Sequence, residues 1–152
     1  MAWLVALLVV VIDQASKLWA VNALPFAQEI PFLPGLLQFC RVNNTGAAFS
    51  LFSGSTPVLA LVSLAVGVGV ALLLLRQPPT KPLPALALGF LLGGAVGNGI
   101  DRWRLGAVID FLEFVPISFP VFNVADVAIN LAVLCFVIDL LAGLRREGSR
   151  DA

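Results

Sequence analysis

Four long apolar runs limit the folds that are open to this chain. They cover residues 3–24, 57–75, 83–100 and 121–144. As a helix that rises about 1.5 Å per residue, each run is long enough to cross about 30 Å of hydrocarbon. Only 12% of the residues are charged, against about 25% in an ordinary soluble domain. The sequence therefore predicts an all-α membrane protein, with four transmembrane helices in a single domain over residues 1–152.

The first run is expected to remain in the protein as a span. A secretory signal peptide would need a basic segment before its apolar core and a small-residue cleavage site after it. Met1 to Ile12 contains no Lys or Arg, and the run continues through Asp13 and Lys17 without such a site.

The connections between the runs differ in length and pattern. Residues 37–43 alternate apolar and polar side chains, which predicts a strand, and residues 48–52 could pair with it. Residues 25–56 should therefore hold a small antiparallel sheet on one membrane face. Residues 103–120 mix Phe with charged side chains and are expected to lie in the interface. The glycines of the third run predict close contact between helices.

Basic residues predict the orientation, because cytoplasmic loops carry an excess of Lys and Arg. One side of the membrane would carry five of them and the other side three. The five are Arg76, Lys81, Arg145, Arg146 and Arg150, and the three are Arg41, Arg102 and Arg104. Both termini are therefore expected in the cytoplasm. The sheet and residues 103–120 would then face outward.

The composition also excludes several functions. The net charge is zero, so the chain has no basic surface for nucleic acid. It contains no His, which rules out Ser-His-Asp and Cys-His catalysis and most zinc sites. No metal is expected. Cys40 and Cys135 are expected to stay unpaired as small hydrophobic side chains.

Charged residues within apolar runs are costly and point to function. Asp13 and Lys17 are four residues apart, on one helix face, where they can pair. The pair could bind a substrate or join helices, and the second reading is favoured. Asn98, Asp101 and Arg102 close the third run. Arg102 could bind a carboxylate or a lipid phosphate, or Asp101 and Arg102 could simply mark where the helix meets the interface.

A polar stripe opens the fourth run. Asn123, Asp126 and Asn130 share one helix face, which is expected to face the bundle interior, either as a site or as a polar contact between helices. Asp110 lies between apolar neighbours, and the loop from Asp110 to Asp126 could bring the two carboxylates together. Such a pair would share one proton. One carboxylate could then activate water while the other polarises a carbonyl, which hydrolyses a peptide without His or metal.

Two other classes of protein remain open on this reasoning. A small transporter or proton-coupled channel could use the same carboxylates as ion ligands, although they gather towards one membrane face and no paired half-repeats are seen. A non-catalytic assembly subunit could use the polar stripes only to join helices. A Ser16–Lys17 dyad is geometrically poor, because neighbouring helical residues point about 100° apart.

Five motifs, in order, resemble those of the lipoprotein signal peptidases, also called signal peptidase II, which are aspartyl proteases of the bacterial inner membrane. The motifs are residues 13–17 (DQASK), 44–50 (NTGAAFS), 94–102 (GAVGNGIDR), 108–111 (VIDF) and 119–126 (FPVFNVAD).

The resemblance implies the roles of ten residues. Asp110 and Asp126 match the catalytic dyad. The positions that line the site and bind or support the substrate are Asn44, Gly46, Asn98, Arg102 and Asn123, and the more structural polar positions are Asp13, Lys17 and Asp101. The implied fold has four transmembrane helices, an extracytoplasmic β-cradle and an interfacial helix. The implied substrate is a prolipoprotein that is cut just before its diacylglyceryl-modified Cys. We expect membrane lipid as a further partner, no cofactor, no nucleic acid and a monomer.

Overall fold

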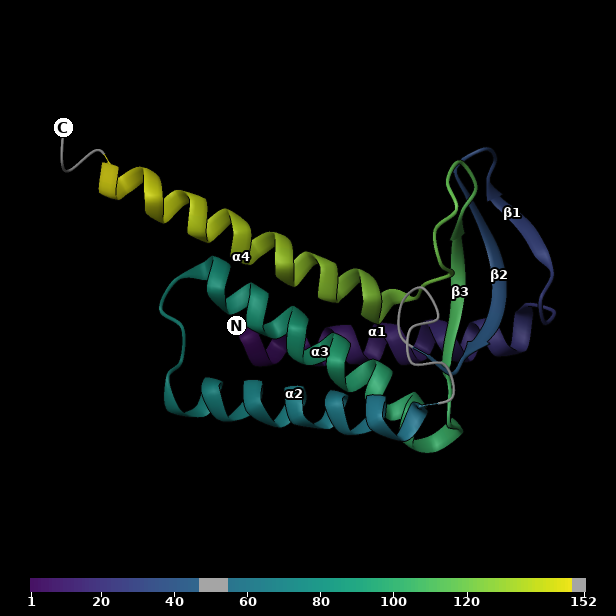
Figure 1. Ribbon diagram of the computed structural model, residues 1–152, viewed down its shortest axis with the longest axis horizontal. Helices are drawn as coiled ribbons and strands as arrows, with labels where there is room; N and C mark the ends of the chain where they lie inside the picture. Colours follow the sequence, from purple (N-terminus) through teal and green to yellow (C-terminus); the bar gives the residue numbers. More distant parts are fainter. Residues whose placement is uncertain (47–54, 149–152) are drawn as a thin grey trace.

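Four helices carry the apolar runs, which confirms the predicted class of fold. The computed structural model describes residues 1–46 and 55–148. Its helices are α1 (Ala2–Ala23), α2 (Thr56–Arg76), α3 (Pro82–Leu105) and α4 (Val124–Gly148). Within the described residues, all four are long and apolar enough to cross a membrane. The helices form a bundle with a small sheet at one end, and α1 begins and α4 ends away from that sheet (Figure 1).

Proline and glycine mark the helix ends. Helices α2 and α3 each have a proline in their first turn, where its missing N–H costs nothing. Helix α3 ends at Gly106, whose φ of 70° is the left-handed conformation that glycine adopts without strain. This helix runs past residue 100, where its apolar run ends, because Asp101 lies inside the bundle and is paired there.

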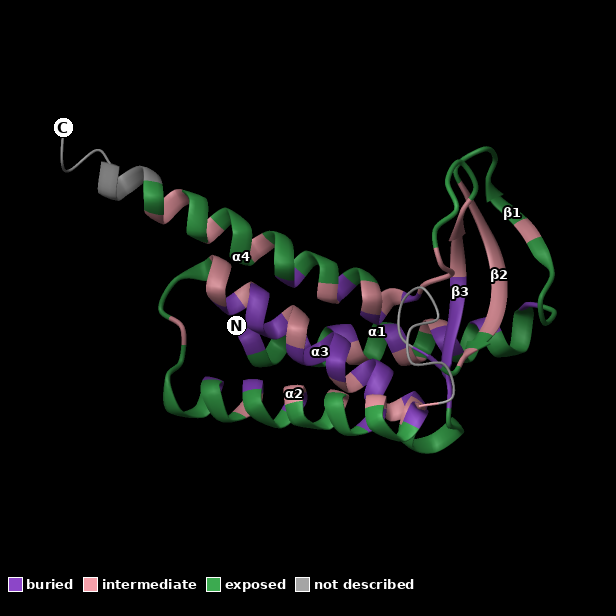
Figure 2. Cartoon of the chain, in the orientation of Figure 1, coloured by how far each residue is buried: buried purple, intermediate pink, exposed green. Residues whose placement is uncertain are grey.

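Helix α3 forms the centre of the bundle and contacts each of the other three helices. It is also the most buried helix (Figure 2). Its glycines allow this packing, as the sequence predicted. A Cβ atom on Gly93 would lie 2.6 Å from Val9 of α1, and one on Gly94 would lie 2.6 Å from the Ala125 carbonyl of α4. Side chains at these positions would force the helices apart.

Among the described residues, three antiparallel strands form the sheet, in the order β1-β2-β3. They are β1 (Glu29–Leu33), β2 (Leu37–Asn44) and β3 (Val108–Phe114). Strand β2 is the strand predicted from the alternation in residues 37–43. Its expected partner, residues 48–52, falls outside the described residues. Its observed partners are β1 and β3, and β3 lies in the segment 103–120 that was expected at the interface.

Aromatic side chains attach the sheet to the end of α1. The Trp19 ring packs edge-on against Phe39 of β2, with centroids 5.1 Å apart, and against Phe111 of β3 at 6.2 Å. Phe111 also joins a buried cluster with Ala20 and Leu24. This packing holds β3 over the end of the bundle, with Asp110 buried beside the helices.

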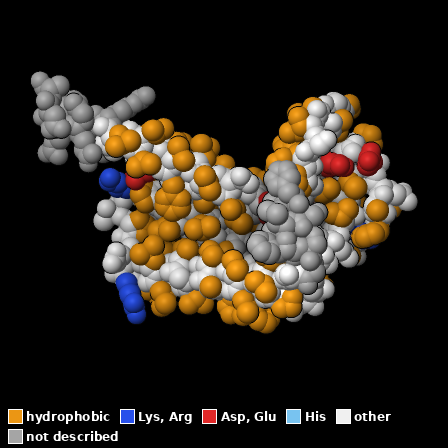
Figure 3. All heavy atoms as spheres, viewed as in Figure 1, with side chains coloured by type: hydrophobic (Ala, Val, Ile, Leu, Met, Phe, Trp, Pro, Cys, Tyr) orange, Lys and Arg blue, Asp and Glu red, His pale blue; other side chains and the backbone are white. Residues whose placement is uncertain are grey.

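The helices present apolar side chains to their surroundings. The exposed large hydrophobic residues come mainly from α1, α2 and α4. In the view of Figure 3, hydrophobic side chains cover the face formed by the helices, and the Lys and Arg side chains lie at the end opposite the sheet. Arg76 ends α2 and Lys81 precedes α3 at that end. A surface of this kind suits lipid as the solvent.

Candidate active site

Asp110 lies near the middle of β3, on the side of the sheet that meets the bundle. Its side chain is 1% exposed. Its Oδ1 accepts a hydrogen bond of 2.6 Å from Nδ2 of Asn123, and its Oδ2 accepts one of 2.9 Å from Nδ2 of Asn44. The strand and these two amides therefore hold both carboxyl oxygens in place.

The pKa of Asp110 is raised to about 7 from its ordinary value near 3.8. The main cause is burial, which disfavours the charged form, and the second cause is the nearby charge of Asp126. The hydrogen bonds from Asn44 and Asn123 and the charge of Lys17 lower the pKa only in part. Asp110 can therefore hold a proton near neutral pH.

Asp126 lies in the first turn of α4, where it is locked into the cap of that helix. Its Oδ2 accepts a hydrogen bond from the backbone N–H of Asn123 at 3.1 Å, and its own N–H donates to Oδ1 of Asn123 at 2.9 Å. This reciprocal pair is a capping box, with Asn123 as the N-cap. The other oxygen, Oδ1, accepts from Nδ2 of Asn98 at 2.8 Å.

Asn98 links the two carboxylates to a buried lysine. Its Oδ1 accepts hydrogen bonds from Nζ of Lys17 and from Nδ2 of Asn123, both at 3.0 Å. Because this oxygen faces two donors, the amide must turn its Nδ2 towards Asp126. Asn123 in turn donates to Asp110. A single chain of amides therefore runs from Lys17 to both aspartates.

Lys17 is the centre of a buried charge cluster. It pairs with Asp13 at 2.9 Å and with Asp101 at 3.0 Å, so the predicted Asp13–Lys17 pair is confirmed. Oδ1 of Asp13 accepts the N–H of Ala125 at 2.9 Å, which adds a negative charge at the start of α4. Oδ2 of Asp101 accepts the N–H of Ile109 at 3.1 Å, next to Asp110. The cluster thus ties α1, α3, β3 and α4 together.

Gln14 is a polar contact whose role the sequence reasoning missed. Its Nε2 lies within hydrogen-bond distance of both Asp13 Oδ2 and Asp101 Oδ1, at 3.1 Å each. Its position beside Asp13 in an apolar run could have suggested a role for it. Its contacts with α3 could not be predicted, because residue spacing along α1 says nothing about a neighbouring helix.

The two aspartates open into one pocket of about 570 Å³. Asn44, Asn98 and Arg102 line it as well. Nδ2 of Asn44 reaches Asp110, while its Oδ1 accepts the N–H of Gly46 and so shapes the turn after β2. The Nη1 of Arg102 donates to Ser63 at 3.2 Å, and its buried Nε has no partner among the described residues.

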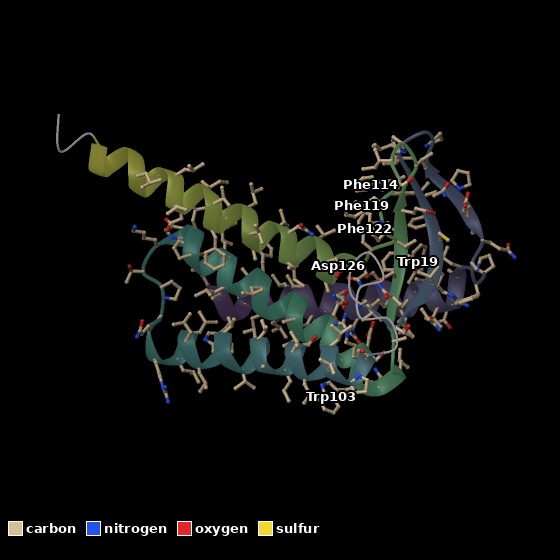
Figure 4. All side chains as sticks on the ribbon, in the orientation of Figure 1. Trp19, Trp103, Phe114, Phe119, Phe122 and Asp126 are labelled. Carbon is tan, nitrogen blue, oxygen red and sulfur yellow. The ribbon has the colours of Figure 1, made fainter. Side chains whose placement is uncertain are left out.

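Three phenylalanines form an aromatic wall of this pocket. Phe114, Phe119 and Phe122 lie close together beside Asp126, where α4 meets the sheet (Figure 4). The ring centroids of Phe114 and Phe122 are 5.1 Å apart, and those of Phe119 and Phe122 are 5.8 Å apart. Apolar residues of α4 extend the pocket along the helix. The pocket therefore combines a polar end at the aspartates with an apolar body.

The predicted polar stripe on α4 divides in the structure. Asn123 is fully buried and Asp126 is half-buried, but Asn130 is exposed on the pocket side. The prediction that the stripe faces the bundle interior is therefore wrong for Asn130.

The site thus brings together most of the residues that the sequence analysis selected. Asp110, Asp126, Asn44, Asn98 and Arg102 line the pocket. Asn123 bonds to three of them, Asp110, Asp126 and Asn98. The charge cluster of Asp13, Lys17 and Asp101 adjoins this network through the bond from Lys17 to Asn98. In the described part of the chain, no three side chains of His, Cys, Asp or Glu come close enough to bind a metal ion. The arrangement offers one carboxyl that can be protonated near neutral pH and a second carboxyl beside it, which suits acid–base chemistry on a water molecule.

Comparisons with known proteins give one consistent family. The family model described as signal peptidase (SPase) II matches residues 5–142. A lipoprotein signal peptidase of Parasynechococcus marenigrum (strain WH8102) is 57% identical over 136 residues, which cover 90% of this chain and 86% of the relative. One of Synechococcus sp. (strain RCC307) is 53% identical over 131 residues, which cover 86% of this chain and 87% of the relative. A solved structure of a bacterial membrane enzyme matches with a TM-score of 0.85 at 26% identity, covering 93% of this chain and 87% of that one.

Proposed function

This chain belongs to the signal peptidase II family of aspartic-type peptidases, which process the signal peptides of prolipoproteins, and we propose that Asp110 and Asp126 are its catalytic pair. The observation that carries the proposal is their common pocket. Asp110 lies on the sheet and Asp126 on α4. Each carboxyl accepts a hydrogen bond from an asparagine side chain.

In the proposed reaction Asp110 begins protonated and Asp126 begins ionised. Asp126 takes a proton from water while the water oxygen attacks the carbonyl carbon of the scissile bond. Asp110 gives its proton to the carbonyl oxygen, and a neutral diol forms. The C–N bond then breaks, Asp126 passes its proton to the leaving nitrogen, and Asp110 recovers a proton from a diol hydroxyl. The raised pKa of Asp110 supports its place as the initial acid.

We propose that the scissile bond is the one just before the diacylglyceryl-modified Cys of a prolipoprotein. Such a substrate stays in the membrane, because each buried CH₂ of its acyl chains is worth about 0.8 kcal/mol. A pocket with a polar end and an apolar body along α4 suits a substrate that is both peptide and lipid. Both carboxyls come from one chain, so the proposal needs only a monomer.

In this proposal the sheet and the carboxylate pair lie at the outer face of the bacterial inner membrane, and both termini lie in the cytoplasm. Arg76 and Lys81 support this orientation, because they lie at the end of the bundle opposite the sheet. Water would reach the pair from the outer surface.

The test is cleavage of a diacylglyceryl-modified prolipoprotein by the purified protein in detergent or vesicles. Wild type should cut just before the lipidated Cys. Asp110→Asn and Asp126→Asn should each fold and show no measurable cleavage, whereas Asp139→Asn, a carboxyl far along α4, should keep full activity. If either Asn variant in the pair keeps near-full activity, the assignment of the catalytic pair is wrong.

A further inference from the structure

Asn130 is a polar residue that the catalytic network does not use. It lies in the apolar part of α4 and is exposed on the side of the pocket. Asn is a weak helix former, and a polar group at hydrocarbon depth is costly unless it is hydrogen-bonded. No hydrogen bond to another helix accounts for it, since among the described residues its side chain bonds only to its own helix.

The orientation of Asn130 brings it towards the aspartates. Its Nδ2 donates to the backbone carbonyl of Asp126 at 2.9 Å. Four residues are about one helical turn, or about 6 Å. The amide therefore lies against the turn that carries Asp126 and faces the same pocket.

Asn130 also has a hydrogen-bonding group to spare. The other two asparagines of the pocket, Asn44 and Asn98, are each bonded through both the amide oxygen and the amide nitrogen. Oδ1 of Asn130 accepts no hydrogen bond from any residue that the structure describes. It is an open acceptor, one turn below the carboxylate pair on the membrane side.

A substrate in this pocket brings donors that need such an acceptor. To reach the aspartates, the residues before the scissile bond must leave the helix of the signal peptide. Their backbone N–H groups then lose their helical partners, and at this depth little water replaces them. The acyl chains and their ester groups carry acceptors but no N–H donor.

We propose that Oδ1 of Asn130 accepts a backbone N–H from the signal-peptide residues just before the scissile bond, and so holds the substrate main chain beside the aspartates. This inference rests on the proposed function and deepens it. Asn130 is a substrate-binding residue here and takes no part in proton transfer.

The first test compares Asn130→Leu with Asn22→Leu. Asn22 is a matched control, because it is exposed near the end of α1 and makes the same bond to the carbonyl four residues before it, at 2.8 Å. We expect Asn130→Leu to raise KM about tenfold with little change in kcat, as for loss of a bond made equally in the ground and transition states. Its thermal stability should stay at or above that of wild type. Asn22→Leu should change neither constant.

A second variant, Asn130→Ala, keeps the test valid if leucine obstructs the pocket or disturbs folding. It removes the same acceptor without added bulk, so it should raise KM to a similar extent. Wild-type KM in Asn130→Ala, or a fall in stability that accounts for the whole loss, would overturn the inference.

The second test locates the donor on the substrate. Prolipoprotein analogues are made in which one backbone amide, at each residue before the lipidated Cys in turn, is replaced by an ester that lacks the N–H. With wild type, one analogue should have a kcat/KM about tenfold lower than that of the all-amide substrate. With Asn130→Leu, the same analogue and the all-amide substrate should have equal kcat/KM, as expected when the two groups interact with each other. If every analogue loses equally with both proteins, the proposed bond does not exist.

The outcomes separate this inference from the proposed function. If wild type does not cut the lipidated substrate, the proposed function fails first. If wild type cuts and the effect of Asn130→Leu depends instead on replacing the acyl esters by ethers, the residue binds the lipid and the inference is wrong.

Discussion

Asn123 and Asp126 bond to each other twice at the start of α4, each through its backbone N–H and its side-chain oxygen. The same asparagine donates to Asp110 through Nδ2. One side chain therefore caps the helix and bridges to the second carboxyl, and the two duties depend on different atoms. The oxygen makes the cap, and the nitrogen makes the bridge.

Substitutions at Asn123 should separate these duties. Serine keeps an oxygen that can cap the helix, but it cannot reach Asp110. We expect both Asn123→Ser and Asn123→Ala to lower the free energy of unfolding, because both remove the buried bonds of Nδ2 to Asn98 and Asp110. Asn123→Ala should lower it by about 1 kcal/mol more, because it also loses the cap. Both variants should lower kcat about ten- to hundredfold, because Asp110 becomes ionised as it gives up its proton in the proposed reaction, and a hydrogen bond to a charged group is worth about 1.5–3 kcal/mol.

Unfolding in mixed detergent micelles and prolipoprotein cleavage would measure the two effects. Full activity in Asn123→Ser would contradict the bridge to Asp110. Equal stability of the serine and alanine variants would contradict the role of the oxygen in the cap.

Lys17→Met should destabilise the protein strongly. The variant keeps most of the side-chain volume but leaves Asp13 and Asp101 buried without their cation. Breaking a buried pair in this way costs about 3–5 kcal/mol. Adding Asp101→Asn to Lys17→Met should recover part of the loss, because it removes one of the uncompensated charges. Lys81→Met, outside the cluster, is the control. A double variant less stable than Lys17→Met alone would argue against this charge balance.

The raised pKa of Asp110 predicts a pH dependence of stability. The unfolded chain loses this proton near pH 3.8, and the folded protein keeps it to about pH 7. Between these values the folded state binds more protons, so the free energy of unfolding falls as pH rises. The stability that Asp110 contributes is fully present below about pH 3.8 and is lost above about pH 7. Asp110→Asn should remove that slope, and a slope unchanged in this variant would assign the effect to another group.

Activity should follow the same proton. If Asp110 is the acid, kcat/KM should fall about tenfold per pH unit once the pH exceeds about 7. Single-turnover cleavage between neutral and alkaline pH measures this fall in kcat/KM. At each pH a control confirms that the protein is still folded. A flat profile through that range would show that Asp110 does not supply the proton.

Gly97 is a position where one added methyl group should disturb the site. A Cβ there would lie 2.6 Å from Oδ2 of Asp13. Gly97→Ala should cost about 1–3 kcal/mol of stability and displace the side chain that caps Ala125. Gly69→Ala is the control, because nothing lies within 4 Å of its added Cβ. Thermal unfolding of both variants decides the point, and equal melting temperatures would contradict close packing at Gly97.

Much of the fold could be predicted from the sequence because lipid imposes length and apolarity on each span. The glycines of α3 similarly predicted close packing between helices. Strand β3 escaped prediction because both of its faces are buried near Asp110, so it lacks the alternation that marks β2. Strand β1 is an exposed edge strand that contains Pro31, and its short pattern carries little information.

The site was predictable in its residue types more than in its geometry. Intramembrane polar residues such as Lys17 and Asn98 stand out against apolar neighbours, and motif resemblance selected Asp110 and Asp126. Asn130 was misplaced because helical spacing shows which residues share a face and does not show what that face meets. Asn130, the last residue of the polar stripe, faces the pocket instead of a neighbouring helix.

The central position of α3 has a consequence for how the protein is made. Synthesis proceeds from the N-terminus, and α1 and α2 can enter the membrane as separate helices, but the helix that packs against both of them emerges later. Asp110 follows α3, and Asp126 arrives only with α4. A nascent chain therefore brings Asp110 and Asp126 together only after α4 has been made, so on the proposed assignment it could not cut a peptide before that point.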